Sequence, residues 1–315
     1  MLAVHRYIIK RVIMLIPIIF GVSFIIFSIL YIIPGDPGSI ILGSGALQAD
    51  IDKLNNELGY NLPFFQRYFK YMADAFLRFD LGLSYASKLP TFDEIITRLP
   101  TSLLIAFNGT FFALGAGVPL GVLSAVRQYS LWDKIPTALA LFLASLPAFL
   151  IGMVLMLFFS LRLGWLPSSG IGSWMHYVMP MLALGLPYAG QQLRFTRSSM
   201  LETIRQDYVR TARAKGASER TIIWKHAMKN ALLPVITIAG NNFGILIGGA
   251  VVTETLFGIP GLGTLVVNGV KQKDIPVVMG GIITLAIAFS IVMLLVDLAY
   301  AFVDPRIRAK YASMR

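Results

Sequence analysis

The sequence YVRTARAKG, residues 208–216, lies at the centre of a long basic segment between two apolar stretches of the chain. The basic segment covers residues 197–229, while the flanking stretches, 163–193 and 230–253, contain no Lys, Arg, Asp or Glu. A chain that enters and leaves an apolar environment has little reason to carry so large a polar insert unless another molecule binds it. We therefore expect this segment to contact a second protein in the cytosol.

The composition indicates a membrane protein. Of 315 residues, 56% are hydrophobic and 14% are charged, whereas a soluble domain carries more charge on its surface. The uncharged windows of this chain lack the alternation of barrel strands, and backbone groups in lipid must pair internally, so the windows are predicted to be helices. The predicted fold is all-α and integral to the membrane, with six transmembrane helices. Six such windows are long enough to cross about 30 Å of hydrocarbon: residues 12–35, 99–126, 135–161, 163–193, 230–253 and 275–296.

The N-terminal window is preceded by basic residues, as in a signal peptide. Its apolar stretch is longer than is usual there, and no small-residue cleavage site precedes Pro34. We expect a retained first span.

The distribution of positive charge predicts the orientation. With a cytosolic N-terminus, the inside segments hold eighteen Lys and Arg residues and the outside segments nine, six of which lie in one long loop. This bias follows the positive-inside rule, so both termini are predicted to be cytosolic in a multi-pass protein of the inner or plasma membrane. The net charge of +11 thus needs no nucleic-acid partner.

Sequence patterns of enzymes and metal sites are missing. The chain contains no Gly-Lys pair, no His-Glu-x-x-His and no Gly-x-Ser-x-Gly. It has no cysteine, and its histidines, His5, His176 and His226, are far apart and lack carboxylates at ligand spacing. We expect no catalytic residue, no metal site and no cofactor bound by this chain.

The basic segment predicts a helix, a sharp bend and a second helix. Residues 197–215 can continue the fourth span, and Gly216 can adopt the left-handed conformation that ends a helix. Ser218 can cap a new helix over 218–230, with Glu219 in its first turn. The fifth span is expected to begin near Pro234.

Apolar residues at the centre of the second helix suggest a docking surface: Ile222, Ile223 and Trp224, followed by His226. A short exposed helix held between two spans fits a socket in another protein. Two alternatives remain open. Ile222 and Trp224 can pack beneath the chain's own helices, or the arginines can bind anionic lipid headgroups.

Several strings of this sequence resemble those of a known protein family. The string from Asp207 to Gly216, with Arg210, Thr211 and Ala212 at its core, resembles the cytosolic loop of permease subunits of ABC importers, in the version of the dipeptide, oligopeptide and nickel family. Arg210 stands where the general loop has Glu, and residues 226–229 read HAMK where it has Ile-x-Leu-Pro; both departures are usual in the peptide subfamily. Further strings match in the same order along nearly the whole chain: PGDP (34–37), DLGLS (80–84), residues 163–170, RFTRS (194–198), PGLG (260–263) and residues 297–308.

The resemblance implies a type I importer permease that forms half of a translocation pathway. Its partners would be a homologous second permease, two ATPase subunits that bind ATP and Mg, and an extracytoplasmic substrate-binding protein, all in a lipid bilayer. The implied cargo is a di- or oligopeptide, with nickel or a metallophore as the alternative. A different class, an ion-driven secondary transporter, would need carboxylates within the spans, which the windows lack.

The same resemblance divides the chain into three parts. Residues 1–100 hold the first span and an extracytoplasmic segment, 101–304 the five-helix core with its coupling loop at 197–232, and 305–315 a cytosolic tail. Within the first part, residues 61–77 are rich in Phe and Tyr and are typical of a short amphipathic helix. It can lie against the membrane, a partner or the chain's own outer face.

Polar residues of the fifth span are candidates for the pathway. Asn241 and Asn242 can face a cavity, and Glu254 can contact cargo or a gate, because a carboxylate near hydrocarbon is costly. Alternatively, Glu254 lies in headgroup water. The spacings Gly117–Gly121 and Gly244–Gly248 permit close helix contact, although such spacings are common in apolar stretches.

Overall fold

The computed structural model describes residues 2–32, 35–43 and 45–303. The predicted C-terminal tail, 305–315, lies outside these residues, and the three-part division of the chain stays a prediction. The described residues are helical, apart from turns and an isolated bridge between Leu83 and Pro90, which confirms the all-α prediction.

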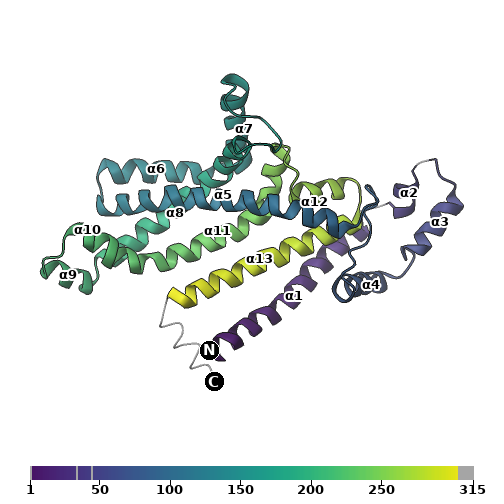
Figure 1. Cartoon of the computed structure of the whole chain (residues 1–315), viewed down its shortest axis with the longest axis horizontal. Coiled ribbons are helices and arrows are strands. Elements are labelled where there is room, and N and C mark those ends of the chain that lie inside the picture. The colour runs from purple at the N-terminus through teal and green to yellow at the C-terminus, as the bar shows by residue number, and fades with distance from the viewer. Residues whose placement is uncertain (1, 33–34, 44, 304–315) are drawn as a thin grey trace. The chain divides into compact units, whose positions relative to one another are not determined.

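The helices follow one another with short connections (Figure 1). Their bounds are α1 (Leu2–Ile32), α2 (Pro37–Leu42), α3 (Gln48–Glu57), α4 (Phe64–Leu77), α5 (Thr91–Val126), α6 (Leu131–Ser145), α7 (Ala148–Leu155), the π-helical η1 (Met156–Arg162), α8 (Met175–Ile204), α9 (Asp207–Ala214), α10 (Glu219–Thr221), the π-helical η2 (Ile222–Ala227), α11 (Met228–Leu256), α12 (Leu262–Lys271) and α13 (Ile275–Val303).

The chain forms two compact units. The large unit contains Leu103–Ile259 with the described parts of residues 2–9 and 289–303, and the small unit contains Lys10–Ser102 and Pro260–Ala288.

Among the described residues, four helices are long and apolar enough to cross a membrane: Ile13–Ile32, Thr91–Val126, Pro234–Leu256 and Ile275–Val296. A fifth crossing is possible if α6 and the helix that follows it, Ala148–Arg162, form one broken span. The fourth predicted window corresponds to α8, which also carries Gln and Arg side chains. The number of six spans therefore stays a prediction.

The third predicted span is not one continuous helix. It bends by 102° between Ser145 and Ala148, where Leu146 and Pro147 are both extended. Proline has no N–H for the helix ladder and disfavours helical backbone in the residue before it. A search for uncharged windows ignores this effect, which explains the error.

Helix α8 is central to the large unit, where it packs against α5, α6, α7 and α11. Glycines make these contacts close. A Cβ atom on Gly117 of α5 would lie 2.6 Å from the carbonyl oxygen of Ala189, and one on Gly190 of α8 would lie 2.6 Å from that of Ala140. The spacing Gly117–Gly121 therefore does serve close packing.

The small unit has its own core. Phe27 of α1, Tyr68 of α4, Leu262 of α12 and Met279 of α13 are buried in one cluster. Helix α12 was not predicted from the sequence. Its buried residues Leu262, Leu265, Val266 and Gly269 repeat at the spacing of a helix face, a signal that was available.

Gly117→Ala is expected to lower the free energy of unfolding by about 1–3 kcal/mol, because the added methyl group forces α5 away from the α8 backbone. Gly115→Ala, on the same helix, is the matched control, since a Cβ there meets nothing within 4 Å. It should be neutral or slightly stabilising, because alanine is the better helix former. Thermal unfolding of the purified permease complex measures both, and equal midpoints would contradict the packing.

Candidate functional site

The segment between α8 and α11 begins with a break that the sequence analysis did not predict. The expected helix through residue 215 is wrong, because α8 ends at Ile204 and α9 starts at Asp207. Gln206 between them is extended, with φ −71° and ψ 149°. Asp207 then occupies the first turn of α9, where a negative charge is favoured by the helix dipole.

The bend after α9 occurs at Gly216, as predicted. Gly216 has φ +83°, a conformation that costs an L-residue with a side chain about 1–2 kcal/mol. Its N–H donates to the carbonyl of Arg213 at 3.0 Å, and the N–H of Ala217 donates to that of Ala212 at 3.2 Å. These two bonds form a complete Schellman motif, so the turn has a fixed geometry.

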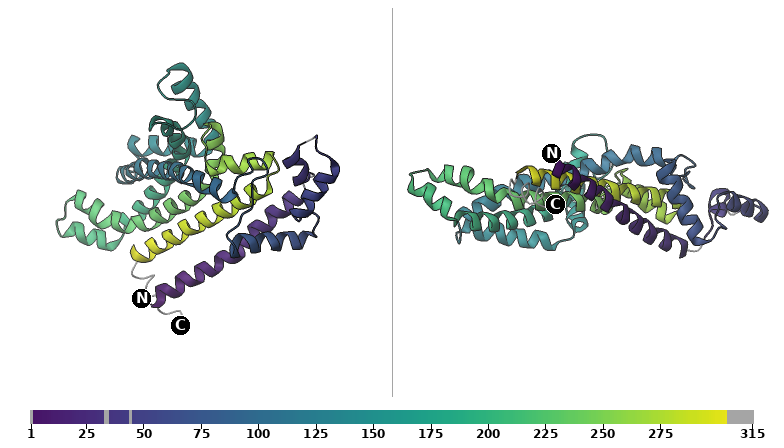
Figure 2. Two further views of the ribbon diagram at one scale, coloured as in Figure 1. Left: turned by 45° about the vertical axis from the view of Figure 1, so that its right-hand side comes forward. Right: turned by 90° about the horizontal axis from the view of Figure 1, so that it is seen from below.

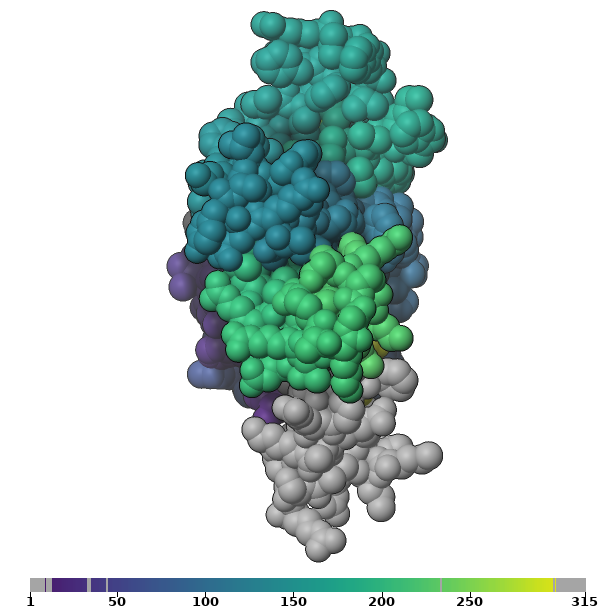
Figure 3. Space-filling view, turned by 90° about the vertical axis from the view of Figure 1, so that its left-hand side faces the viewer, coloured from purple at the N-terminus to yellow at the C-terminus, as the bar shows by residue number. Residues whose placement is uncertain are grey.

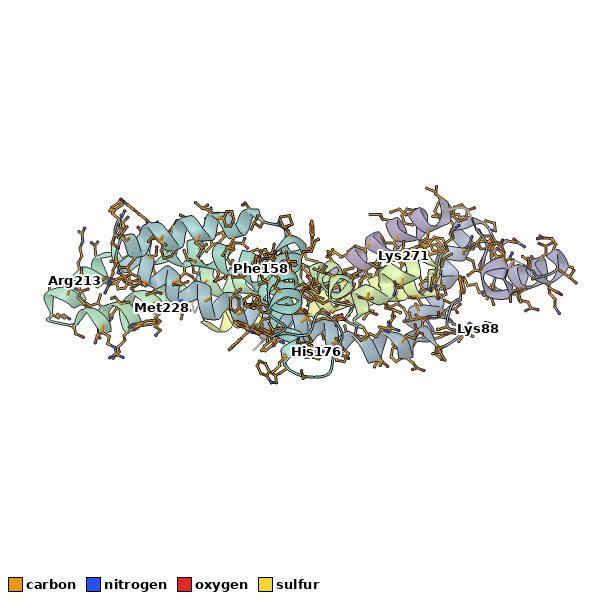
Figure 4. All side chains as sticks on the ribbon, turned by 90° about the horizontal axis from the view of Figure 1, so that it is seen from above. Lys88, Phe158, His176, Arg213, Met228 and Lys271 are labelled. Atoms are coloured by element: carbon orange, nitrogen blue, oxygen red, sulfur yellow. The ribbon has the colours of Figure 1, made fainter. Side chains whose placement is uncertain are left out.

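Side chains brace this turn on both sides. Ser218 accepts a hydrogen bond from the N–H of Thr221 and so caps α10. The guanidinium of Arg213 donates to both carboxylate oxygens of Glu219, at 2.7 and 3.1 Å, and holds the pKa of that carboxyl below its usual value. Figure 4 labels Arg213 at this turn.

A further bond ties the two ends of the segment together. The side-chain amide of Asn230 donates to the Tyr208 hydroxyl at 2.7 Å. Because Tyr208 belongs to α9 and Asn230 to α11, the segment is closed into a loop.

The second helix of the loop is not a separate element. Helix α10, η2 and α11 run on without a break from Glu219 to Leu256. The predicted helix over 218–230 is therefore present, and the apolar span does begin at Pro234, but the expected start of a new helix at this proline is wrong. Pro234 lies inside α11. The helix continues past it although one N–H is missing, and η2, with its wider turns, precedes it.

The three apolar residues on which the docking prediction depended differ in exposure. Ile222 is fully buried, as is Val209 of α9. Ile223 packs on a cluster that includes Met200 and Ala227. Trp224, in contrast, has 54% of its surface exposed. Ile222 therefore packs on the chain itself, as one of the two alternatives predicted, whereas Trp224 does not.

The exposed side of the loop is polar and basic around the indole of Trp224. Arg220, Thr221, Trp224 and Lys225 line a shallow hollow of about 350 Å³. The remaining predicted coupling residues differ in exposure: Arg210, Thr211, Gly216, Ser218 and Glu219 are exposed, and Ala212 and His226 are half-buried. Figure 3 views the large unit from this side, with the loop in green.

An ion pair beneath the loop was missed. Asp133 in the first turn of α6 is nearly buried, and Arg197 of α8 donates to its two carboxylate oxygens at 2.6 and 2.8 Å. The hydroxyl of Ser124 on α5 and the N–H of Tyr129 also donate to this carboxylate. No local pattern links residues so far apart in the chain, although each lies near the end of an uncharged window.

The candidate pathway residues lie along α11 and do not converge. Asn241 is half-buried, and Asn242 is buried with its side-chain nitrogen unpaired among the described residues. Glu254 is fully buried, and its role at the pathway stays a prediction. Asn242 and Glu254 are separated by about 18 Å along the helix, too far to form one site.

Comparison with known families agrees with this arrangement. Residues 117–309 match the model of the "binding-protein-dependent transport system inner membrane component", and residues 4–106 match the model of the N-terminal part of such components. The chain belongs to this family. It is a multi-pass membrane protein and a permease subunit of an ABC importer, which implies an ATPase and a substrate-binding protein as partners.

Relatives extend over the full chain. The glutathione transport system permease protein GsiC of Escherichia coli O6:H1 is 40% identical over 97% of this chain and 99% of its own length. GsiC of Escherichia coli K12 is 39% identical over the same shares.

Solved structures show the same fold. The permease of the inward-facing MetNI methionine ABC transporter has a TM-score of 0.57 at 20% identity and covers 67% of this chain and 96% of its own. A chain of an amino acid ABC transporter gives 0.51 at 13% identity, covering 68% and 94%. The predicted importer-permease fold is confirmed.

Asp133→Asn is expected to destabilise the protein by about 3 kcal/mol, the lower end of the range for a broken buried pair. The lower end applies because part of Arg197 is in contact with solvent. Arg194→Gln, one turn earlier on α8 and exposed, should change stability by no more than about 0.5 kcal/mol. The denaturation midpoints of the two variants decide the question: a wild-type value for Asp133→Asn means that the pair is dispensable.

Proposed function

We propose that this chain forms half of the translocation pathway for small peptides and transmits the motion of a separate ATPase through the loop between α8 and α11. The observation that carries the proposal is the exposed indole of Trp224 on a turn of fixed geometry. A large apolar side chain costs free energy in water, and a braced turn can transmit displacement where a mobile loop would not.

The chemistry of the loop surface indicates what would receive it. Arg220 and Lys225 line the hollow beside Trp224, and Arg210 is exposed on α9. A cleft that accepts this surface would combine an apolar socket for the indole with acidic side chains at its rim. Val209 and Ile222, both buried, hold the loop against its own unit and would not enter the cleft.

The cargo is inferred from the relatives. GsiC is named for the transport of glutathione, which is a tripeptide, and this supports di- and oligopeptides of similar size as the substrate class. Nickel or a metallophore remains the alternative. A chelated metal needs no protein ligands, so the side chains of this chain do not separate the two.

The remaining parts of the importer follow from the proposal. A homologous second permease would complete the pathway, and two ATPase subunits would bind ATP and Mg, so this chain itself would be non-catalytic and hold no cofactor. An extracytoplasmic binding protein would deliver the peptide. The cytosolic position of both termini and of the loop belongs to the same proposal.

Trp224→Ala is expected to weaken the binding of the ATPase subunit by about 2 kcal/mol or more, as is typical of a central aromatic residue at an interface. Trp132→Ala is the matched control, since Trp132 is equally exposed at 56% but lies outside the loop. Affinity measured between the ATPase and the permease in nanodiscs compares the two. If both variants bind like the wild type, Trp224 does not dock on the ATPase.

Uptake measurements test the cargo. Vesicles with the complete importer and internal ATP should accumulate labelled glutathione or dipeptides with collapsed ion gradients. Excess unlabelled peptide should compete, while a nickel chelate should not. Competition by the nickel chelate alone would favour the metallophore alternative.

A further inference from the structure

Helix α4 presents more than one kind of surface. Tyr68, Met72 and Ala75 form its buried face. Phe65 and Phe69, four residues apart and therefore on one side of the helix, are 61% and 58% exposed. A polar face that includes Gln66 and Lys70 is also exposed. The buried face confirms that α4 packs on its own chain, but it leaves more than half of the surface of Phe65 and of Phe69, the aromatic stripe, exposed.

The buried face lies against a membrane span. The ring of Phe64 contacts that of Tyr31 at a centroid distance of 5.0 Å, and Phe76 stacks on Phe20 at 6.5 Å. Between them, the Tyr68 hydroxyl donates to the carbonyl of Phe20 at 2.9 Å. Figure 2 shows α4 beside α1.

These contacts give the depth of α4. The α1 residues that it touches lie inside Ile13–Ile32, the part of α1 that is apolar enough to cross the membrane. Phe20 is about 18 Å along the helix from Ile32, more than half of the roughly 30 Å hydrocarbon thickness. A helix held at this level is next to lipid unless a protein covers it.

The aromatic stripe continues the surface of α1. Phe24 of α1 stacks on Phe65 at 6.5 Å with the rings inclined by 21°. Phe24, Ile25 and Ile29 are themselves exposed on the span. Acyl chains that surround α1 at this level therefore reach Phe65 without a gap.

Charged side chains on or next to α4 have aromatic or ionic partners. The Arg67 guanidinium lies 4.2 Å from the ring centre of Tyr60 and 5.4 Å from that of Tyr31, so aromatic faces replace part of its water. Asp74 and Arg78 pair at 2.9 Å. Lys70 has a long side chain that can extend toward water.

We propose that Phe65 and Phe69 contact lipid acyl chains, so that α4 is a membrane-embedded helix alongside the C-terminal half of the α1 span. A helix with Phe on one face and basic residues on another is suited to this position. Three positions of this helix were open from the sequence: against the membrane, against a partner or against the chain's own outer face. In the proposal, separate faces of α4 contact the chain itself and the membrane.

Spin labels at single cysteines test the proposal, and the chain offers a background without cysteine. Phe65→Cys and Phe69→Cys report on the stripe, while the neighbouring Gln66→Cys and Lys70→Cys are matched controls on the same helix. The full chain and its partner subunits are reconstituted in phosphatidylcholine vesicles. A water-soluble nickel complex is present in the solution on both sides of the bilayer. Oxygen, which concentrates in acyl chains, is the second probe.

The ratio of oxygen to nickel collision rates should be at least about tenfold higher at Phe65 and Phe69 than at the two controls, because the nickel complex is excluded from hydrocarbon. Equal ratios would place the stripe in water and overturn the proposal. Immobile labels shielded from both probes would show that protein covers the stripe, which overturns it as well. Two positions in each class keep the result readable if one variant does not assemble.

Discussion

The ion pair between Asp133 and Arg197 joins the helices from which the loop between α8 and α11 emerges. A nearly buried carboxylate must keep its cation and its hydrogen bonds, since losing them leaves an uncompensated charge. Asp133 takes these bonds from α8 and α5 and from the turn between α5 and α6. Glycine contacts such as Gly117 against α8 hold the helix backbones close together. The loop leaves directly from α8, so its orientation depends on this joint.

Much of the architecture could be predicted because it depends on local physics. Uncharged windows identified α1, α5, α11 and α13, since spanning a bilayer requires only length and apolarity. Gly216 predicted the bend because few other residues adopt its conformation. No single rule for the effect of proline on a helix predicts both the bend at Pro147 and the continuous helix through Pro234. Proline interrupts one helix and is tolerated in another, and the surrounding packing decides which occurs.

The position of the loop could be predicted from the sequence, but the exposure and pairing of the side chains could not. Ile222 and Trp224 look alike as apolar residues in a short helix, and only the way the helix packs on the rest of its unit determines that one is buried and the other exposed. The ion pair between Asp133 and Arg197 joins distant parts of the chain, so no periodic pattern in the sequence predicts it. For Glu254, the sequence indicated an unusual carboxylate but not its complete burial.

The unbroken helix from Glu219 to Leu256 has a mechanical consequence. It is a rod of roughly 55 Å, with Trp224 near one end and Glu254 near the other. In the proposed function, a displacement of the Trp224 end would be carried toward Asn242 and Glu254 by a single helix. The points at which that helix would bend most easily are the π-helical η2 and Pro234, which lacks an N–H for the helix ladder.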